Sequence, residues 1–340
     1  MHHDKQKYIL TLDVGNKVKL LRHTGLKTLE PADPFYTGFH DGLVNRIQDA
    51  LPEVEVEVIH MESLAEKIIS RASNECSSMS NAVIVSTCSE IAAPNRGHIL
   101  EINRLVDSKG NILGLGPRPG HPPLDDQIDG IARLAKDQQI VLVENGAFSG
   151  KTLLYVINKF KERGVDLKAI VVGFVFPGSL DAVKKEFSGD VHVIEEASTP
   201  LDWMPDHDFV PFIPNCGRVL GVNMNGSNFP FYSYNGASYS FPYLRPFAPM
   251  TEWASIPEKD ASKISDYCLR KTRDLFLTLE ELNGRKIKVK DLAINPTRSK
   301  VSVPFKVSGS HFFDIFNENV GEFLWDVCKH AFLHVDESKY

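Results

Sequence analysis

Cysteine and long apolar runs are both scarce in this sequence. Its 340 residues hold five cysteines, an odd number, and no two of them have the CxxC spacing. This pattern favours reduced cysteines over a disulfide framework or a zinc site. No apolar run approaches the ~18 residues that a transmembrane helix requires. The N-terminus MHHDKQKYILTLDV also lacks the apolar core of a signal peptide. We therefore expect a cytoplasmic protein with no membrane segment.

An excess of basic charge is lacking as well. Lysine and arginine number 38 against 44 aspartates and glutamates, which gives a net charge of −6. Proteins that bind nucleic acid usually carry a basic surface, so we expect no nucleic-acid partner. The hydrophobic content of 42% and the charged content of 24% are ordinary for a globular protein. A chain of this length suits two domains, or one large domain with additions.

The most informative stretch is IVLVENGAFSGKTLLYV, residues 140–156. Four consecutive aliphatic residues open it, as in a strand that is buried on both faces of a parallel sheet. Small residues follow, and then apolar residues recur at helical spacing. A strand, a tight loop and a helix N-terminus together bind anions, because free N–H groups and the positive end of the helix dipole point at the ligand.

The segment GAFSGKT suggests a nucleotide-binding P-loop, but its spacing is wrong. The Walker A motif needs four residues between its first glycine and the Gly-Lys pair. Only three separate Gly146 from Gly150, and Asn145 stands where the first glycine belongs. A P-loop hydrolase also needs an acid after a downstream apolar strand, and the strand expected at 169–176 is followed by Pro-Gly. The hydrolase remains an alternative with less support.

The same residues fit the phosphoribosyl-pyrophosphate (PRPP) loop of type I phosphoribosyltransferases without a gap, and they resemble it. That family has two acidic residues after a buried strand, three small or apolar residues, and then Thr-Gly-x-Thr. The matching residues here are Glu144, Asn145, Gly146, Ala147, Phe148, Ser149, Gly150, Lys151 and Thr152. The resemblance implies that Glu144 and Asn145 face the ribose as the catalytic pair. It implies that residues 146–152 hold the 5′-phosphate, and that Mg²⁺ binds with PRPP at Glu144.

Asn145 departs from the family pattern, because the family has a second acid there. An amide can still hydrogen-bond a ribose hydroxyl. It cannot stabilise positive charge that develops on the ribose in an oxocarbenium-like transition state. The substitution therefore weakens the case for catalysis more than the case for binding.

The resemblance extends, less specifically, over about residues 80–220. Thr87, Cys88 and Ser89 stand where the family has a pyrophosphate-binding loop, and the 100–123 segment stands where it has a mobile hairpin. Basic residues in or near that hairpin are candidates to contact pyrophosphate: Arg96, Arg104, Lys109 and Arg118. Residues 202–221 stand where the family has a segment that recognises the base. Trp203 or Phe209 could stack on a base there, although either type of residue is more often part of the core.

The pattern of the whole chain predicts an α/β fold with an open, mostly parallel sheet flanked by helices, resembling a phosphoribosyltransferase. Three parts are expected: an N-terminal α/β part at 1–75, a core at 76–225, and a C-terminal α+β extension at 226–340. We expect strands at 8–14, 54–59, 81–86, 140–143, 169–176 and 191–194, and helices at 41–51, 63–72, 126–136, 152–163, 180–187 and 259–281. A hairpin should turn at 107–110, and 114–123 should be an irregular exposed loop.

The C-terminal third carries no catalytic pattern. Residues 225–250 are rich in aromatic residues, Gly, Ser and Asn, which predicts an extended loop packed on the surface, or else an aromatic wall for a ligand or partner. Residues 283–291 read as an exposed strand with a solvated lysine face, and 312–333 as a helix. His311, His330 and His334 lack the spacing of a metal site. This extension could serve as a homodimer interface or bind a partner protein.

Two functions therefore stay open. The first is a phosphoribosyltransferase that binds PRPP with Mg²⁺ and transfers the phosphoribosyl group to a nitrogenous base. The second is a regulatory module that binds PRPP or a nucleotide without turnover, which Asn145 favours.

Overall fold

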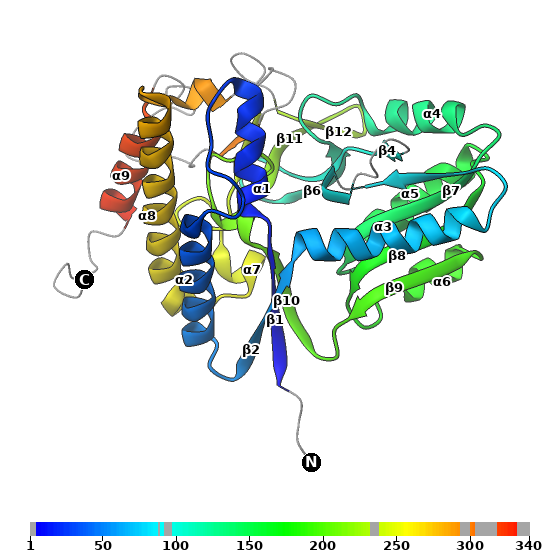
Figure 1. The fold of residues 1–340 in the computed structure, drawn as a ribbon, viewed down its shortest axis with the longest axis horizontal. Helices are drawn as coiled ribbons and strands as arrows, with labels where there is room; N and C mark the ends of the chain where they lie inside the picture. Colours follow the sequence, from blue (N-terminus) through cyan, green and yellow to red (C-terminus); the bar gives the residue numbers. More distant parts are fainter. Residues whose placement is uncertain are drawn as a thin grey trace.

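The computed structural model describes residues 5–87, 89–91, 97–231, 238–292, 300–302 and 318–331. Its elements form two groups that meet along strands near the middle of the molecule (Figure 1). The middle of the chain forms one group, and the two ends of the chain together form the other. No helix among the described residues is long and apolar enough to cross a membrane.

A five-stranded parallel sheet forms the centre of the first group. Its strands, in spatial order, are β4 (Gly97–Ile99), β3 (Ala82–Ser86), β7 (Gln139–Ala147), β8 (Leu167–Val175) and β9 (Asp190–Glu196). Helix α3 (Met61–Ser77) packs on one face. The other face is covered by α4 (Leu124–Leu134), α5 (Lys151–Glu162) and α6 (Asp181–Glu186). The expected α/β architecture, with a mostly parallel sheet flanked by helices, is confirmed.

Strand β7 shows why a continuous apolar run predicted a strand that is buried on both faces. Ile140 and Leu142 point into the core beneath α4 and α5. Val141 and Val143 point into the core beneath α3. All four side chains are fully buried, because successive side chains of a strand face opposite sides of the sheet.

A second parallel sheet belongs to the group that joins the two chain ends. Its strands, in spatial order, are β10 (Pro200–Pro205), β1 (Gln6–Leu12) and β2 (Val54–His60). The long helices of this group are α2 (Pro34–Ala50), α8 (Glu258–Asn283) and α9 (Val320–Ala331). One apolar core contains side chains from β1, α2, α8 and α9. The hydroxyl of Tyr8 also donates to the carbonyl of Ala254 at 2.9 Å, so the extension packs directly on the N-terminal part.

The expected three-part division stays a prediction, although several elements cross it. Helix α3 begins on the N-terminal side of residue 75 and packs on the central sheet. Strand β10 follows that sheet in sequence and pairs with β1 instead.

A mixed sheet connects the two groups. It contains β14 (Lys300–Ser302), β13 (Ser238–Phe241), β11 (Arg218–Met224), β5 (Ile102–Val106) and β6 (Ile112–Pro117), and β12 (Ser227–Pro230) pairs with β11. The hairpin at 107–110 is confirmed between β5 and β6. The prediction of an irregular loop at 114–123 is wrong for its first part, because residues 114–117 belong to β6. Gly116 serves packing there: a Cβ on it would lie 2.3 Å from Cδ1 of Leu105.

Two C-terminal expectations are wrong. Residues 238–241 form the buried strand β13 and not a surface loop. The exposed strand at 283–291 is instead a turn that leads into the 3-10 helix η5 (Val289–Leu292). The N–H of Ile287 donates to Oε1 of Glu280 at 3.0 Å, and Lys288 makes an isolated antiparallel bridge to Asn319. Ile287 and Val289 are buried in the core that also contains side chains of α8. The expected helix at 312–333 is present as α9 over Val320–Ala331. Residues 312–317 and 332–333 lie outside the described residues, as do His311 and His334.

The boundaries of α2 and β1 differ from the expected positions. Helix α2 begins at Pro34, earlier than expected, because Asp33 caps it by accepting from the N–H of Phe35 at 2.9 Å. Strand β1 ends at Leu12, and helix α1 (Val14–Lys19) begins two residues later. Asp13 therefore lies at the end of a strand, where ligand-binding side chains of parallel sheets are commonly found.

Candidate functional site

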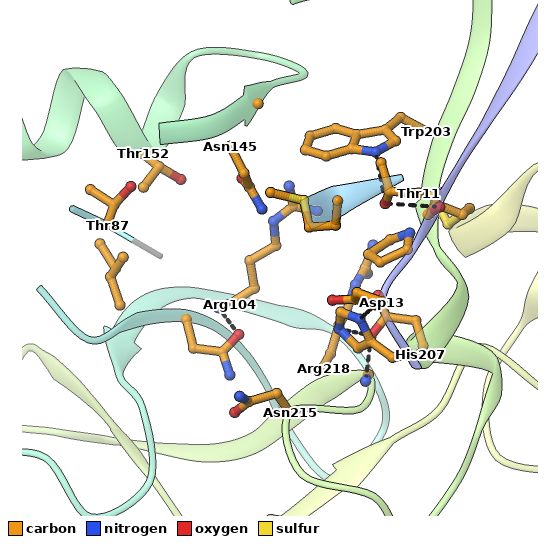
Figure 2. A pocket seen from close by; sticks show the side chains of 18 of the residues that line it. Thr11, Asp13, Thr87, Arg104, Asn145, Thr152, Trp203, His207, Asn215 and Arg218 are labelled. Carbon is orange, nitrogen blue, oxygen red and sulfur yellow. Dashed lines mark hydrogen bonds and ion pairs between the residues drawn. The ribbon is translucent and has the colours of Figure 1, made fainter. Parts of the chain in front are cut away.

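A pocket of about 210 Å³ lies between the two groups, at the carboxyl ends of β1, β3, β7 and β10. The central sheet lines one end of it with Thr87, Glu144, Asn145, Gly146 and Thr152. The second sheet lines the other end with Thr11, Asp13, Met204, His207 and Asp208. Figure 2 shows Thr87 and Thr152 at one end, Asp13 and His207 at the other, and Arg104 between them. Open α/β sheets bind ligands at this edge.

Glu144 is fixed in place at the end formed by the central sheet. Its side chain is buried, and Oε2 accepts a 2.6 Å hydrogen bond from the hydroxyl of Thr87. Oε1 accepts from the N–H of Asn145 at 3.0 Å. Burial raises the pKa of Glu144, while these two bonds and the nearby Arg118 and Arg104 act to lower it. The sequence predicted both Thr87 and Glu144 in a site, and the structure brings them together.

The expected strand, loop and helix at 140–156 is confirmed, but only part of the motif faces the pocket. Glu144, Asn145, Gly146 and Thr152 line it, and Ala147, Phe148, Ser149, Gly150, Lys151 and Ser89 do not. The ring of Phe148 is half exposed and packs on Phe176, with centroids 4.6 Å apart. Cys88 lies outside the described residues. The roles given to these residues by the resemblance stay predictions.

Gly150 shapes the turn into α5. Its φ is +67°, a conformation that side chains disfavour. A Cβ on it would lie 2.3 Å from the carbonyl oxygen of Ser179, in the loop after β8. The turn delivers Thr152 to the pocket in the first turn of a 12-residue helix, where N–H groups lack helical partners. This end of α5 can therefore accept an anionic group.

Trp203 lines the pocket and packs closely against strand β7. A Cβ on Gly146 would lie 2.3 Å from Cη2 of this indole, so only glycine lets strand β7 approach it so closely. The indole N–H of Trp203 donates to the hydroxyl of Thr11 at 3.3 Å. The ring lines the pocket, as the sequence allowed. Phe209, the other candidate to stack on a base, is fully buried in the core and does not line the pocket.

Basic side chains enter the pocket from the mixed sheet. Arg104 comes from β5, Arg118 follows β6, and Arg218 begins β11. The guanidinium of Arg104 reaches across the pocket (Figure 2) and has no hydrogen bond or ion pair with the described residues. Nε of Arg118 lies 3.2 Å from a Glu101 carboxylate oxygen. Of the other predicted cations, Lys109 does not line the pocket, and Arg96 lies outside the described residues.

The far end holds an acid–histidine pair that the sequence reasoning missed. Nδ1 of His207 lies 2.5 Å from Oδ1 of Asp13, and Nζ of Lys17 lies 3.6 Å from Oδ2 of Asp13. Burial acts to raise the pKa of Asp13, but His207 and Lys17 outweigh it and hold that pKa well below its usual range. The available signal was an acid placed directly after an apolar run, in YILTLD.

Asp206 supports this pair from within the protein. It is fully buried, and Oδ1 accepts from the N–H groups of Asp13 and Val14 at 2.9 and 3.0 Å. Oδ2 lies 2.7 Å from Nε2 of His40 on α2. Burial, reinforced by the charge of Asp13, raises the pKa of Asp206 to about 6.

Carboxylates near the pocket bear on the expected Mg²⁺. Oxygen and nitrogen atoms of Asp13, Asp206 and His207 lie within 4.8 Å of one another. We assign no metal there, because Lys17 and the hydrogen bonds within the group already engage these atoms. Glu144 offers the lone pairs that Thr87 and Asn145 leave open. Mg²⁺ at that end would therefore depend mainly on phosphate oxygens of a ligand.

No known family model matches this chain, and no curated protein is significantly similar to it.

Proposed function

We propose that the pocket binds PRPP, or another ribose 5-phosphate compound, in the manner of a type I phosphoribosyltransferase. The observation that carries the proposal is the convergence of the motif strand with other predicted elements. Glu144, Asn145 and Thr152 share a pocket with Thr87 from the expected pyrophosphate loop and with Arg104 from the expected hairpin. These segments are separated by as many as 65 residues, counting from Thr87 to Thr152.

The residue types suit the groups of such a ligand. The first turn of α5 and the hydroxyl of Thr152 can donate to a 5′-phosphate. Glu144 and Asn145 can accept from ribose hydroxyls. The guanidinium of Arg104, which pairs with none of the described residues, can bind pyrophosphate oxygens in a bidentate manner. Mg²⁺, held through the phosphates, would neutralise the charge of the leaving pyrophosphate.

A second candidate function is binding without turnover, as in a sensor or regulator. Asn145 favours it, because Glu144 is then the single carboxylate at the ribose end of the pocket. Burial also raises the pKa of Glu144, which favours its neutral form. Little negative charge would then stabilise an oxocarbenium-like transition state. The two candidates share the same ligand and differ only in whether pyrophosphate is released.

Calorimetric titration tests the binding claim. Mg²⁺ with PRPP should bind, and Arg104→Ala should weaken binding about tenfold, as expected for loss of a charge-assisted contact of ~1.4 kcal/mol. Arg133→Ala is the matched control, because Arg133 is an exposed arginine on α4 that does not line the pocket. Equal affinity of both variants, or no binding by the wild type, would remove the proposal. Tighter binding of Mg²⁺ with ATP would instead favour a nucleotide hydrolase.

A further inference from the structure

The end of the pocket opposite Glu144 contains the components of an acid–base catalyst. Asp13 follows β1 and His207 follows β10. These two strands pair in parallel, so their carboxyl ends place both side chains side by side on the wall of the pocket (Figure 2). The residues belong to a different sheet from the PRPP-type motif, and nothing in that motif requires them.

The hydrogen bonds determine which nitrogen of His207 carries a proton. Asp13 is an ionised carboxylate at neutral pH, because His207 and Lys17 lower its pKa, and it can only accept. Its Oδ1 lies 2.5 Å from Nδ1 of His207, so Nδ1 must donate. In the neutral ring, Nε2 is then left as a proton acceptor. This is the orientation that an adjacent carboxylate gives to a catalytic histidine.

Nε2 of His207 faces another acceptor and not a donor. Oδ1 of Asp208 lies 3.5 Å from it, beyond a good hydrogen bond. That oxygen already accepts from the N–H of Gly217 at 2.6 Å. A ligand N–H placed beside both atoms, such as that of a nitrogen heterocycle, can donate to them. The other charged or titratable groups around His207 are Asp13, Lys17, His40, Asp206 and Arg218.

The pair of Asp13 and His207 is held rigidly by neighbouring groups. The buried carboxylate of Asp206 accepts from the N–H groups of Asp13 and Val14, and so holds the backbone that carries Asp13. The same carboxylate lies 2.7 Å from Nε2 of His40. Rigid placement of a base is what general base catalysis requires, since a misplacement of about 1 Å costs roughly 10²-fold in rate.

We infer that His207, oriented by Asp13, is the general base that takes the proton from an acceptor N–H during phosphoribosyl transfer. This inference rests on the proposed function. The acceptor is a small nitrogen heterocycle placed between His207 and the ribose end, beside the indole of Trp203. Its nitrogen forms a bond to ribose C1 as the bond from C1 to pyrophosphate breaks, and its proton moves to Nε2 of His207. The proton then passes to solvent, so pyrophosphate leaves without needing protonation by the protein.

Two measurements on the full chain test this inference. The first is calorimetric titration of Mg²⁺ with PRPP. The second is release of pyrophosphate from pH 5.5 to 8.5, with water, adenine, hypoxanthine, uracil and nicotinate as acceptors. His207→Gln should lower kcat about 100-fold or more, the usual contribution of a general base, and leave the affinity for PRPP within about twofold. It should also abolish the loss of rate at low pH that protonation of the base causes.

Matched variants keep the test decisive. His192→Gln removes a partly buried histidine of β9 that pairs with Glu75 of α3 and does not line the pocket. This variant should leave the rate and the pH profile unchanged. Asp13→Asn should lower kcat as His207→Gln does, because the amide no longer fixes the ring tautomer. It serves as the second variant if His207→Gln does not fold.

The outcomes separate the two claims. No binding of PRPP by the wild type overturns the proposed function and this inference together. Binding without pyrophosphate release from any acceptor overturns the inference alone and leaves the binding module. Release that His207→Gln and Asp13→Asn do not slow also overturns the inference, while the proposed function stands.

Discussion

The hydroxyl of Thr87 donates a 2.6 Å hydrogen bond to the carboxylate of Glu144, and this bond joins the ends of β3 and β7 at the pocket. Both side chains are buried. A buried carboxylate without its donors costs free energy, so Thr87 helps to keep Glu144 ionised and correctly oriented.

Thr87→Val should therefore destabilise the protein by about 1–3 kcal/mol. The pKa of Glu144 is already raised by burial, so loss of the donor should raise it further. The folded variant would then hold this proton more strongly than the folded wild type does. The loss of stability should therefore grow as the pH rises above the usual pKa range of a glutamate. Urea unfolding at several pH values measures this effect. Thr251→Val is the control, because that hydroxyl bonds Glu258 on the surface at 3.3 Å and should change stability little.

Gly146→Ala should displace the indole of Trp203. The added Cβ would lie 2.3 Å from the ring, and overpacking of this kind costs about 1–3 kcal/mol. The change should break the bond from the indole to Thr11 and shift the tryptophan fluorescence. Gly130→Ala, in α4, meets nothing within 4 Å and should be neutral or stabilising by up to ~1 kcal/mol. Similar fluorescence and stability in both variants would contradict the close packing of Trp203 on β7.

Gly150→Ala tests the turn that begins α5. The substitution combines a left-handed backbone with a contact at 2.3 Å to the carbonyl of Ser179. Gly164→Ala shares the left-handed backbone, at φ +64°, but meets nothing within 4 Å. We expect the first variant to lose more stability than the second, by about 1 kcal/mol or more, and to lose affinity for PRPP. Equal thermal unfolding temperatures would show that the loop after β8 yields to the added methyl group.

Asp206→Asn tests the support beneath the far end of the pocket. The pKa of Asp206 in the folded protein is raised to about 6. The folded state therefore holds this proton more strongly than the unfolded state, and the wild type should lose stability as the pH rises from about 4 to about 6. The variant lacks this ionisation, so its stability should fall less across that window. Asp13 has a lowered pKa, so its titration changes the stability at lower pH. It is present in both proteins. Urea unfolding at several pH values measures the free energy of unfolding of both proteins. If it depends on pH in the same way in both, the raised pKa of Asp206 is contradicted.

The central sheet could be predicted because its signals are local. The aliphatic run at 140–143 and the helical spacing after it depend only on neighbouring residues, and both elements formed as expected. Periodicity could not distinguish 283–291 from a strand, because the alternation there results from packing against α8. The N–H of Ile287 donates to the Glu280 side chain on α8 and not to a neighbouring strand.

The candidate site was predictable at one end only. A motif located Glu144 and Thr152, because the whole strand, loop and helix is contiguous in sequence. Asp13 and His207 are 194 residues apart, and they meet only because β10 leaves the central region and pairs with β1. No local sequence pattern predicts that strand pairing. The sequence therefore gave no reason to associate these two residues.

A crystal structure with PRPP and Mg²⁺ bound would show directly whether the pocket holds PRPP as proposed. We expect the 5′-phosphate at the first turn of α5, within hydrogen-bond distance of Thr152. The ribose should lie beside Glu144 and Asn145, and the pyrophosphate near Arg104. A ligand bound with its phosphates at Asp13 and His207, or outside this pocket altogether, would contradict the account.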